Sequence, residues 1–334
     1  MSEQQISIEQ PERTITDIDG IWVGHWTDPK AKTGCTAVIF PHGAVGGVDV
    51  RGAAPGTRET DLLNGYHAVE KIHAIMLCGG SAFGLSAADG AMRYLEQKKI
   101  GFQTGETVVP IIPAAVLYDL GYGDAHVRPD AQAGEEACKN ASAKVVEQGN
   151  VGAGCGATVG KVLGKDAAMK GGIGSACMLL PNGIKVAALI AVNAMGDIVD
   201  TRTGRQLAGP MWKGNMMSTH EILLNGAGRG ETGTNTTIGV LATDAVLTRE
   251  QTNRMATMGH DGLAKCIWPV HTPLDGDTLF GVSTGEKQRK EDDLLMIFTA
   301  ATCVTEQAVI RAIAHANDVK MDGPCADANK FQKQ

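Results

Sequence analysis

The sequence predicts a layered α+β fold in a single domain. Predicted strands and helices follow one another in mixed order, without a strict strand–helix–strand repeat, which favours a layered sandwich over a doubly wound parallel sheet. The length of 334 residues suffices for one large core, and no linker or internal repeat divides it, so we expect residues 1–334 to form one domain. Glycine is frequent, with 43 residues, which indicates turns and close backbone contacts.

The first half of the chain contains apolar, β-branched runs that are typical of buried strands. Two such runs lie at 35–40, ended by Pro41, and at 72–78, and a loop over 43–61 separates them. Apolar residues at helical spacing predict a helix over 81–99. Two extended segments are expected at 108–113 and 114–118, and a second helix is expected at 131–148.

The second half begins rich in glycine and ends in long regular elements. The pattern Thr248-x-x-Gln251 is a capping box and predicts a helix that ends near Lys265. The last apolar segment, 294–316, contains threonine, glutamate and arginine, so it suits a buried helix better than a membrane span. A loop is expected at 152–160, and a long irregular excursion is expected at 204–234. Four further strands are expected at 176–180, 184–192, 236–243 and 278–284.

Charge and composition exclude several classes of partner. The formal net charge is −7, and no basic stripe is present that would neutralise phosphates, so we expect no nucleic-acid partner. The longest apolar run, 186–192, is far shorter than the roughly 18 residues that span a bilayer, and 1–20 lacks a signal-peptide core. We therefore expect a cytoplasmic protein without membrane association. The eight cysteines lie far apart, which favours reduced, mostly buried thiols.

The glycine-rich run 152–161 allows three interpretations. As a nucleotide-binding loop it lacks the P-loop pattern, and no buried strand precedes it, as a dinucleotide fingerprint requires. The other interpretations are a loop that holds Lys161 near a reactive centre and a plain loop. The nine histidines contain no H-E-x-x-H and no short H-x-H pair, so the sequence predicts no metal and no cofactor.

Two short segments contain candidate catalytic chemistry. At Asn235-Thr236, a small residue precedes a hydroxyl residue at a strand start, and the hydroxyl can attack the Asn235 carbonyl and cut the chain. The freed α-amino group, with a pKa of about 7.7–8, would then serve as the base for the Thr236 hydroxyl. A β-branched strand entrance is the alternative. Asp275 and Asp277 place two carboxylates on one side of an extended chain, unless they lie in a solvated turn.

Six segments, taken together and in order, resemble one family over about residues 14–317. The family comprises the L-aminopeptidase/D-Ala-esterase-amidases and β-peptidyl aminopeptidases and includes the nylon-oligomer (6-aminohexanoate oligomer) hydrolase, whose branch the motifs resemble most. The resemblance implies an αββα four-layer sandwich of the N-terminal-nucleophile type. It also implies an inactive precursor that cuts itself once and assembles into homo-oligomers, often tetramers. The matching segments are 48–61, 79–85, 113–119, 152–161, 235–238 and 275–280.

The resemblance also implies roles for individual residues. The cut would fall between Asn235 and Thr236 and give an α-subunit, 1–235, and a β-subunit, 236–334, with Thr236 as nucleophile. Asn193 matches the family asparagine that helps to hold the oxyanion, and Tyr118 matches a tyrosine of the same pocket. In the nylon-type branch, Lys161 matches a lysine beside the nucleophile. Asp275 and Asp277 match that branch's acid pair, which orients the threonine.

One departure from the family concerns the substrate. The aminopeptidases have a glutamate two residues before the matching tyrosine. This glutamate binds the free amine of the substrate, whereas this chain has Val116 at that position.

From the motifs and the resemblance together, we expect a cofactor-free enzyme that hydrolyses small linear amides or peptides through an acyl-enzyme. The alternative is a family member that never cuts itself and acts as a ligand-binding or scaffold oligomer.

Overall fold

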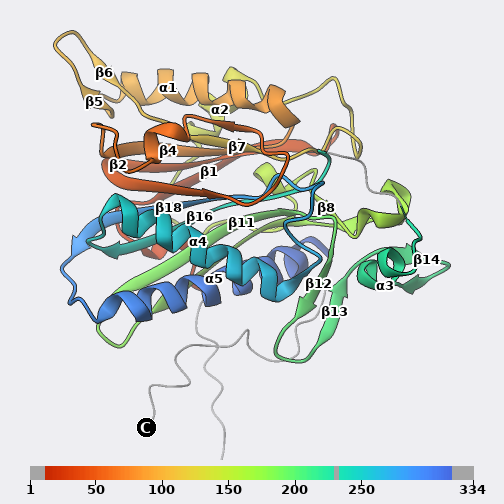
Figure 1. Cartoon of the computed structure of the whole chain (residues 1–334). Coiled ribbons are helices and arrows are strands. Elements are labelled where there is room, and N and C mark those ends of the chain that lie inside the picture. Colours follow the sequence, from red (N-terminus) through yellow and green to blue (C-terminus); the bar gives the residue numbers. More distant parts are fainter. Residues whose placement is uncertain (1–11, 229–232, 318–334) are drawn as a thin grey trace, which may run out of the picture.

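Helices cover both outer faces of two stacked β-layers in the computed structural model of the chain, which describes residues 12–228 and 233–317 (Figure 1). Helices α1 (Ala87–Gln97) and α2 (Ala131–Lys139) pack against one layer. Helices α4 (Arg249–Cys266) and α5 (Asp293–Asn317) pack against the other. The expected αββα order of layers is confirmed, and the predicted capping box at the start of α4 is present.

The two β-layers are parts of one nine-stranded hydrogen-bonded sheet. The strand order is β10-β11-β16-β18-β2-β4-β7-β3, with β1 also paired to β2. Neighbouring strands run antiparallel, except that β16 is parallel to β18 and β4 is parallel to β7. The strands are β1 (Trp22–Asp28), β2 (Thr33–Val50), β3 (Thr57–Arg58), β4 (Lys71–Cys78), β7 (Ala114–Val116), β10 (Gly172–Leu179), β11 (Lys185–Asn193), β16 (Thr236–Ala245) and β18 (Thr278–Lys287).

The long strand β2 connects the two layers. Its first half pairs with β1 and β4, and its second half, from Val45 to Val50, pairs with β18. The expectation that Pro41 ends this strand is wrong. The pairing of β2 with β4 shifts register between Ile39 and Ala44. This irregularity accommodates Pro41, which has no backbone N–H to donate to the ladder.

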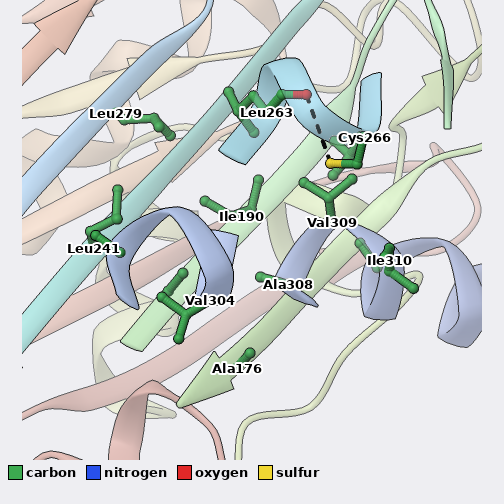
Figure 2. Packing of buried hydrophobic residues seen from close by; sticks show 14 of the residues in the cluster. Ala176, Ile190, Leu241, Leu263, Cys266, Leu279, Val304, Ala308, Val309 and Ile310 are labelled. Carbon is green, nitrogen blue, oxygen red and sulfur yellow. Dashed lines mark hydrogen bonds between the residues drawn. The ribbon is translucent and has the colours of Figure 1, made fainter. Parts of the chain in front are cut away.

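Side chains of the central strands alternate between two cores, which explains their nearly continuous apolar sequences. Ile190 and Leu241 point toward α4 and α5 and pack among the residues that Figure 2 shows. Ala191 and Ile238 point to the core between the two β-layers. A third cluster, which includes Met76 and residues of α1 and α2, lies on the outer face of the other layer. Three cores therefore hold four layers together.

Several local predictions differ from the structure. Residues Ser81–Ser86 form a 3-10 turn before α1, because Gly80 and Ser81 both have positive φ angles. Helix α2 ends at Lys139 instead of residue 148, because Ser142 pairs with Val23 of β1 through two backbone hydrogen bonds. The described part of the expected excursion 204–234, residues 204–228 and 233–234, contains short strands and one helix. The α-helix not yet named is α3 (Thr219–Leu224). The strands not yet named are β5 (Phe102–Gln103), β6 (Val108–Val109), β8 (Thr158–Val159), β9 (Met169–Lys170), β12 (Asp197–Asp200), β13 (Arg205–Ala208), β14 (Met211–Trp212), β15 (Asn215–Met216) and β17 (Ile267–Trp268).

Helix α5 meets the length and composition of a membrane span. However, it packs against β10, β11 and α4 and places Val304 and Ala308 in the core, as expected for a buried helix. Of the seven cysteines in the described part of the chain, six are buried and Cys303 is partly buried. All seven are free thiols, in agreement with the sequence prediction, and Cys325 lies outside the described residues.

Candidate active site

Two adjacent strands bring Thr236 and Asn193 together. Thr236 is the first residue of β16, Asn193 is the last residue of β11, and the two residues are directly opposite in the antiparallel ladder. Because alternate residues of a strand share a face, both side chains lie on the face of Ala191 and Ile238, which contributes to the core between the β-layers. Both are buried, so the site lies at the end of this inner core.

The carbonyl oxygen of Asn235 accepts two hydrogen bonds. One comes from the Thr236 hydroxyl and the other, at 2.9 Å, comes from the backbone N–H of Gly276. A Cβ atom at Gly276 would lie 2.5 Å from the Ala54 carbonyl oxygen and 2.8 Å from the Thr236 Oγ1, so only glycine fits there. Two donors on one carbonyl oxygen polarise the peptide bond between Asn235 and Thr236.

The two candidate acids are almost completely buried, at 2 % exposure for Asp275 and 1 % for Asp277, so the alternative of a solvated turn is wrong. Asp277 accepts a hydrogen bond from the Thr237 N–H at 2.6 Å through Oδ1. Asp275 Oδ2 accepts from the N–H and the hydroxyl of Thr272, at 2.7 and 2.5 Å. Burial raises the pKa of Asp275 to about 6, and the negative charge of Asp277 adds to this shift.

Three groups of this site, His271, Thr272 and the Gly276 amide, are not predicted from the sequence. His271 Nδ1 lies 2.7 Å from Asp277 Oδ2, and the His271 N–H donates to the same oxygen at 3.2 Å. The only sequence signal was the position of His271 and Thr272 a few residues before the acid pair. His271 belongs to no metal-binding spacing, and the residue type of Gly276 does not indicate where its backbone N–H points.

Lys161 links the glycine-rich run to the candidate cleavage site. Its Nζ donates to the carbonyl oxygens of Asn193 and Thr234, both at 2.9 Å. Gly160, with a φ of +70°, turns the chain there, and a Cβ atom at Gly160 would lie 2.3 Å from the Gly209 backbone. Burial lowers the pKa of Lys161 to about 7, and the carboxylates of Asp275 and Asp277 oppose the shift. The run therefore acts as a loop that holds Lys161 at the site.

The Asn193 side chain connects three segments of the site. Its Oδ1 accepts from the Thr158 N–H at 3.0 Å. Its Nδ2 donates to the carbonyl oxygens of Tyr118 at 3.0 Å and Thr234 at 3.2 Å. The Asn193 side-chain amide therefore bonds the carbonyl of Thr234, which lies one residue before the carbonyl of Asn235. Tyr118 reaches Asn193 through its main-chain carbonyl.

Val116, two residues before Tyr118, belongs to the apolar cluster beneath α1 and α2 and is 4 % exposed. Its Cγ2 would lie 2.5 Å from a Cβ atom at Gly56, so the side chain fills the space beside that glycine. The enclosed Val116 side chain therefore supplies no carboxylate for an amine. Among residues 12–228 and 233–317, the structure groups no set of three or more histidine, cysteine, aspartate or glutamate residues that could hold a metal ion.

Comparison with known proteins shows the family of the chain. The sequence profile of peptidase family S58 matches residues 13–325. The chain belongs to this family. An uncharacterized aminopeptidase of Mycobacterium leprae is 42 % identical over 304 residues, which cover 84 % of this chain and 81 % of the relative. A 6-aminohexanoate-oligomer endohydrolase of Kocuria sp. is 32 % identical over 276 residues, which cover 81 % of this chain and 74 % of the relative.

Two solved structures share the fold of this S58 peptidase. A Burkholderia sp. β-aminopeptidase has a TM-score of 0.70 at 21 % identity, with 94 % of this chain and 90 % of that chain covered. The L-aminopeptidase D-Ala-esterase/amidase of Ochrobactrum anthropi, described as a variant of the Ntn-hydrolase fold, has a TM-score of 0.70 at 19 % identity, with coverages of 93 % and 88 %. The chain is therefore a peptidase or amidohydrolase with an Ntn-hydrolase fold.

Proposed function

We propose that this S58 peptidase cuts itself between Asn235 and Thr236 and then hydrolyses small linear amides or peptides with Thr236 as the nucleophile. The observation that carries the proposal is the pair of donors, the Thr236 hydroxyl and the Gly276 N–H, on the Asn235 carbonyl oxygen. This arrangement supports Thr236 as the attacking residue and the Gly276 N–H as an oxyanion donor for the cut. Lys161 and Asn193 both hold the neighbouring Thr234 carbonyl, which fixes the segment before the cut.

Self-cleavage follows an acyl shift from nitrogen to oxygen. The Thr236 Oγ1 attacks the Asn235 carbonyl carbon, the bond from that carbon to the Thr236 nitrogen breaks, and the hydroxyl proton passes to the departing amine. Water then hydrolyses the ester, which gives an Asn235 carboxylate, a free hydroxyl and the α-amino group of Thr236. In substrate turnover, this amine serves as the base for its own hydroxyl. The Asn193 amide, released from Thr234, then donates to the oxyanion of the substrate.

The two pieces share one sheet, so we expect them to remain associated. Strand β16 of the piece 236–334 lies between β11, which belongs to 1–235, and β18. Strand β18 pairs in turn with β2 of the first piece. Association into tetramers and a cytoplasmic location stay predictions.

The substrate prediction concerns the free amine. Because Val116 offers no carboxylate, acetylation of the substrate's amine should change kcat/KM by less than about tenfold. A short 6-aminohexanoate oligomer and its N-acetylated form provide the comparison, with L-alanyl-p-nitroanilide as an aminopeptidase control. Acid quenching followed by mass spectrometry should reveal an acyl adduct on the piece that begins at Thr236. Strict dependence on the free amine would contradict the substrate class, and an adduct elsewhere would contradict the nucleophile.

A second prediction concerns Lys161 and pH. In an uncut chain that carries Thr236→Ala, the folded state loses the Lys161 proton near pH 7, whereas the unfolded chain keeps it until near 10.5. The free energy of unfolding therefore rises with pH between about pH 7 and 10.5, by up to about 1.4 kcal/mol per pH unit. The same chain with Lys161→Met lacks this contribution. Urea unfolding at pH 7 and 9 measures the difference, and Lys165→Met, at an exposed lysine, is the control. A parallel pH dependence of all three proteins would contradict the burial of the Lys161 charge.

A further inference from the structure

His271 has an unusual place beside the acid pair. Its Nδ1 lies 2.7 Å from Asp277 Oδ2, and its backbone N–H donates to the same oxygen at 3.2 Å. The residue has a φ of +55°, a left-handed conformation that a non-glycine residue adopts only when its surroundings fix it. The side chain is 21 % exposed, and its partner Asp277 is 1 % exposed.

The other oxygen of Asp277 is bound to the strand that contains the nucleophile. Asp277 Oδ1 accepts from the Thr237 N–H at 2.6 Å, and Thr237 directly follows Thr236. One carboxylate thus connects the imidazole on one side with the nucleophile's neighbour on the other. The Gly276 amide, between the two acids, bonds the Asn235 carbonyl. A rotation of the Asp277 side chain would break its contacts with the Thr237 N–H and the His271 Nδ1.

A second histidine packs beside the ring of His271. The rings of His260 and His271 meet edge to face, with centroids 4.8 Å apart and an interplanar angle of 69°. The His260 Nε2 donates to the Asp49 carbonyl oxygen at 3.0 Å, since a carbonyl can only accept. Burial lowers the pKa of His260 to about 4, so this ring is neutral near pH 7. Within residues 12–228 and 233–317, its side-chain hydrogen bond goes to Asp49 and none joins it to Asp277. It serves as a packing surface.

We propose that His271 is a positioning residue for self-cleavage and for turnover. Its Nδ1–H fixes the Asp277 carboxylate, which fixes the Thr237 amide and keeps the Thr236 hydroxyl on the carbonyl that it attacks. This inference rests on the proposed function. Loss of the donor would leave a buried carboxylate oxygen with one fewer partner and free it to rotate. A displacement of about 1 Å at a nucleophile can cost about 10²-fold in rate.

Two variants that both carry a side-chain carboxamide test whether the donor must lie at the position of the His271 Nδ1. Asparagine places an amide N–H near the Nδ1 of the imidazole, and glutamine places it near the Nε2. His271→Asn should therefore cleave itself within about tenfold of the wild-type rate, whereas His271→Gln and His271→Leu should be slower by about 10²-fold. In the cut enzyme, kcat should fall by a similar factor while KM stays within about twofold. The uncut fraction, measured by denaturing mass spectrometry at fixed times, gives the first rate.

The matched control is His260→Leu, which removes the neighbouring ring and leaves Asp277 bonded to His271. It should lower the melting temperature and leave the fraction cut unchanged. Equal rates for His271→Asn and His271→Gln, whether fast or slow, would overturn the role of the Nδ1 donor, and this comparison holds even if His271→Leu does not fold. An uncut wild-type chain would instead refute the proposed function itself, so the two failures are distinguishable.

Discussion

Thr236→Ala should leave a single uncut chain of 34.9 kDa without measurable amide hydrolysis. The substitution removes the hydroxyl that contacts the Asn235 carbonyl oxygen and that is the proposed nucleophile of both reactions. Loss of the nucleophile typically costs about 10⁴–10⁶-fold in hydrolases that use a hydroxyl. The methyl side chain still fits at the strand start, so the variant should fold. Denaturing mass spectrometry and an amide assay on the same preparation measure both effects.

Two variants control this experiment. Thr236→Ser keeps the hydroxyl and should still cut itself. Thr237→Val changes the next residue, whose buried hydroxyl has no hydrogen-bond partner in the described chain, and keeps the amide that Asp277 binds. It should cleave at the wild-type rate because its shape is preserved and no hydrogen bond is lost. Two pieces from Thr236→Ala, or an uncut Thr237→Val, would identify a different nucleophile.

Asn193→Ala should slow both self-cleavage and turnover by about 10²–10³-fold, the usual effect of removing one oxyanion donor. The variant loses the bonds to the carbonyls of Thr234 and Tyr118 and leaves the Thr158 N–H without its acceptor. The segment before the cut is then less well held, and the substrate oxyanion has one donor fewer. Time courses of the uncut fraction and kcat measured on the cut portion test the two effects separately.

The control for Asn193→Ala separates rate from stability. Asn253 also makes structural side-chain bonds, accepting from the Val48 N–H at 2.6 Å and donating to the Leu63 carbonyl at 3.1 Å, but it contacts no residue of the site. Asn253→Ala should therefore lower stability and leave both rates unchanged. If Asn193→Ala turned over substrate as fast as Asn253→Ala, Asn193 would not belong to the oxyanion site.

Part of the candidate site could be predicted because its chemistry lies in neighbouring residues. Asn235 and Thr236 provide the proposed scissile bond and nucleophile in one dipeptide, and continuous apolar runs predict the strands that hold them. The burial of Asp275 and Asp277 could not be read from their spacing. It depends on the segment 51–54, whose amides bond the carbonyl oxygens of both acids.

The rest of the site depends on backbone geometry that residue types do not specify. The Gly276 amide reaches the Asn235 carbonyl only because the two segments lie side by side, and His271 reaches Asp277 from a left-handed backbone conformation. The passage of β2 from one layer into the other likewise depends on a register shift near Pro41, where the sequence predicted an end to the strand. Tertiary pairing decided each of these features.

The most direct test of self-cleavage is the intact mass of the purified chain under denaturing conditions. Cleavage before Thr236 divides the 34.9 kDa chain into 1–235 and 236–334. The expected result is two masses of about 25 and about 10 kDa, with Thr236 as the first residue of the smaller piece and both pieces eluting together under native conditions. A single mass of 34.9 kDa that persists after long incubation would contradict the proposed mechanism.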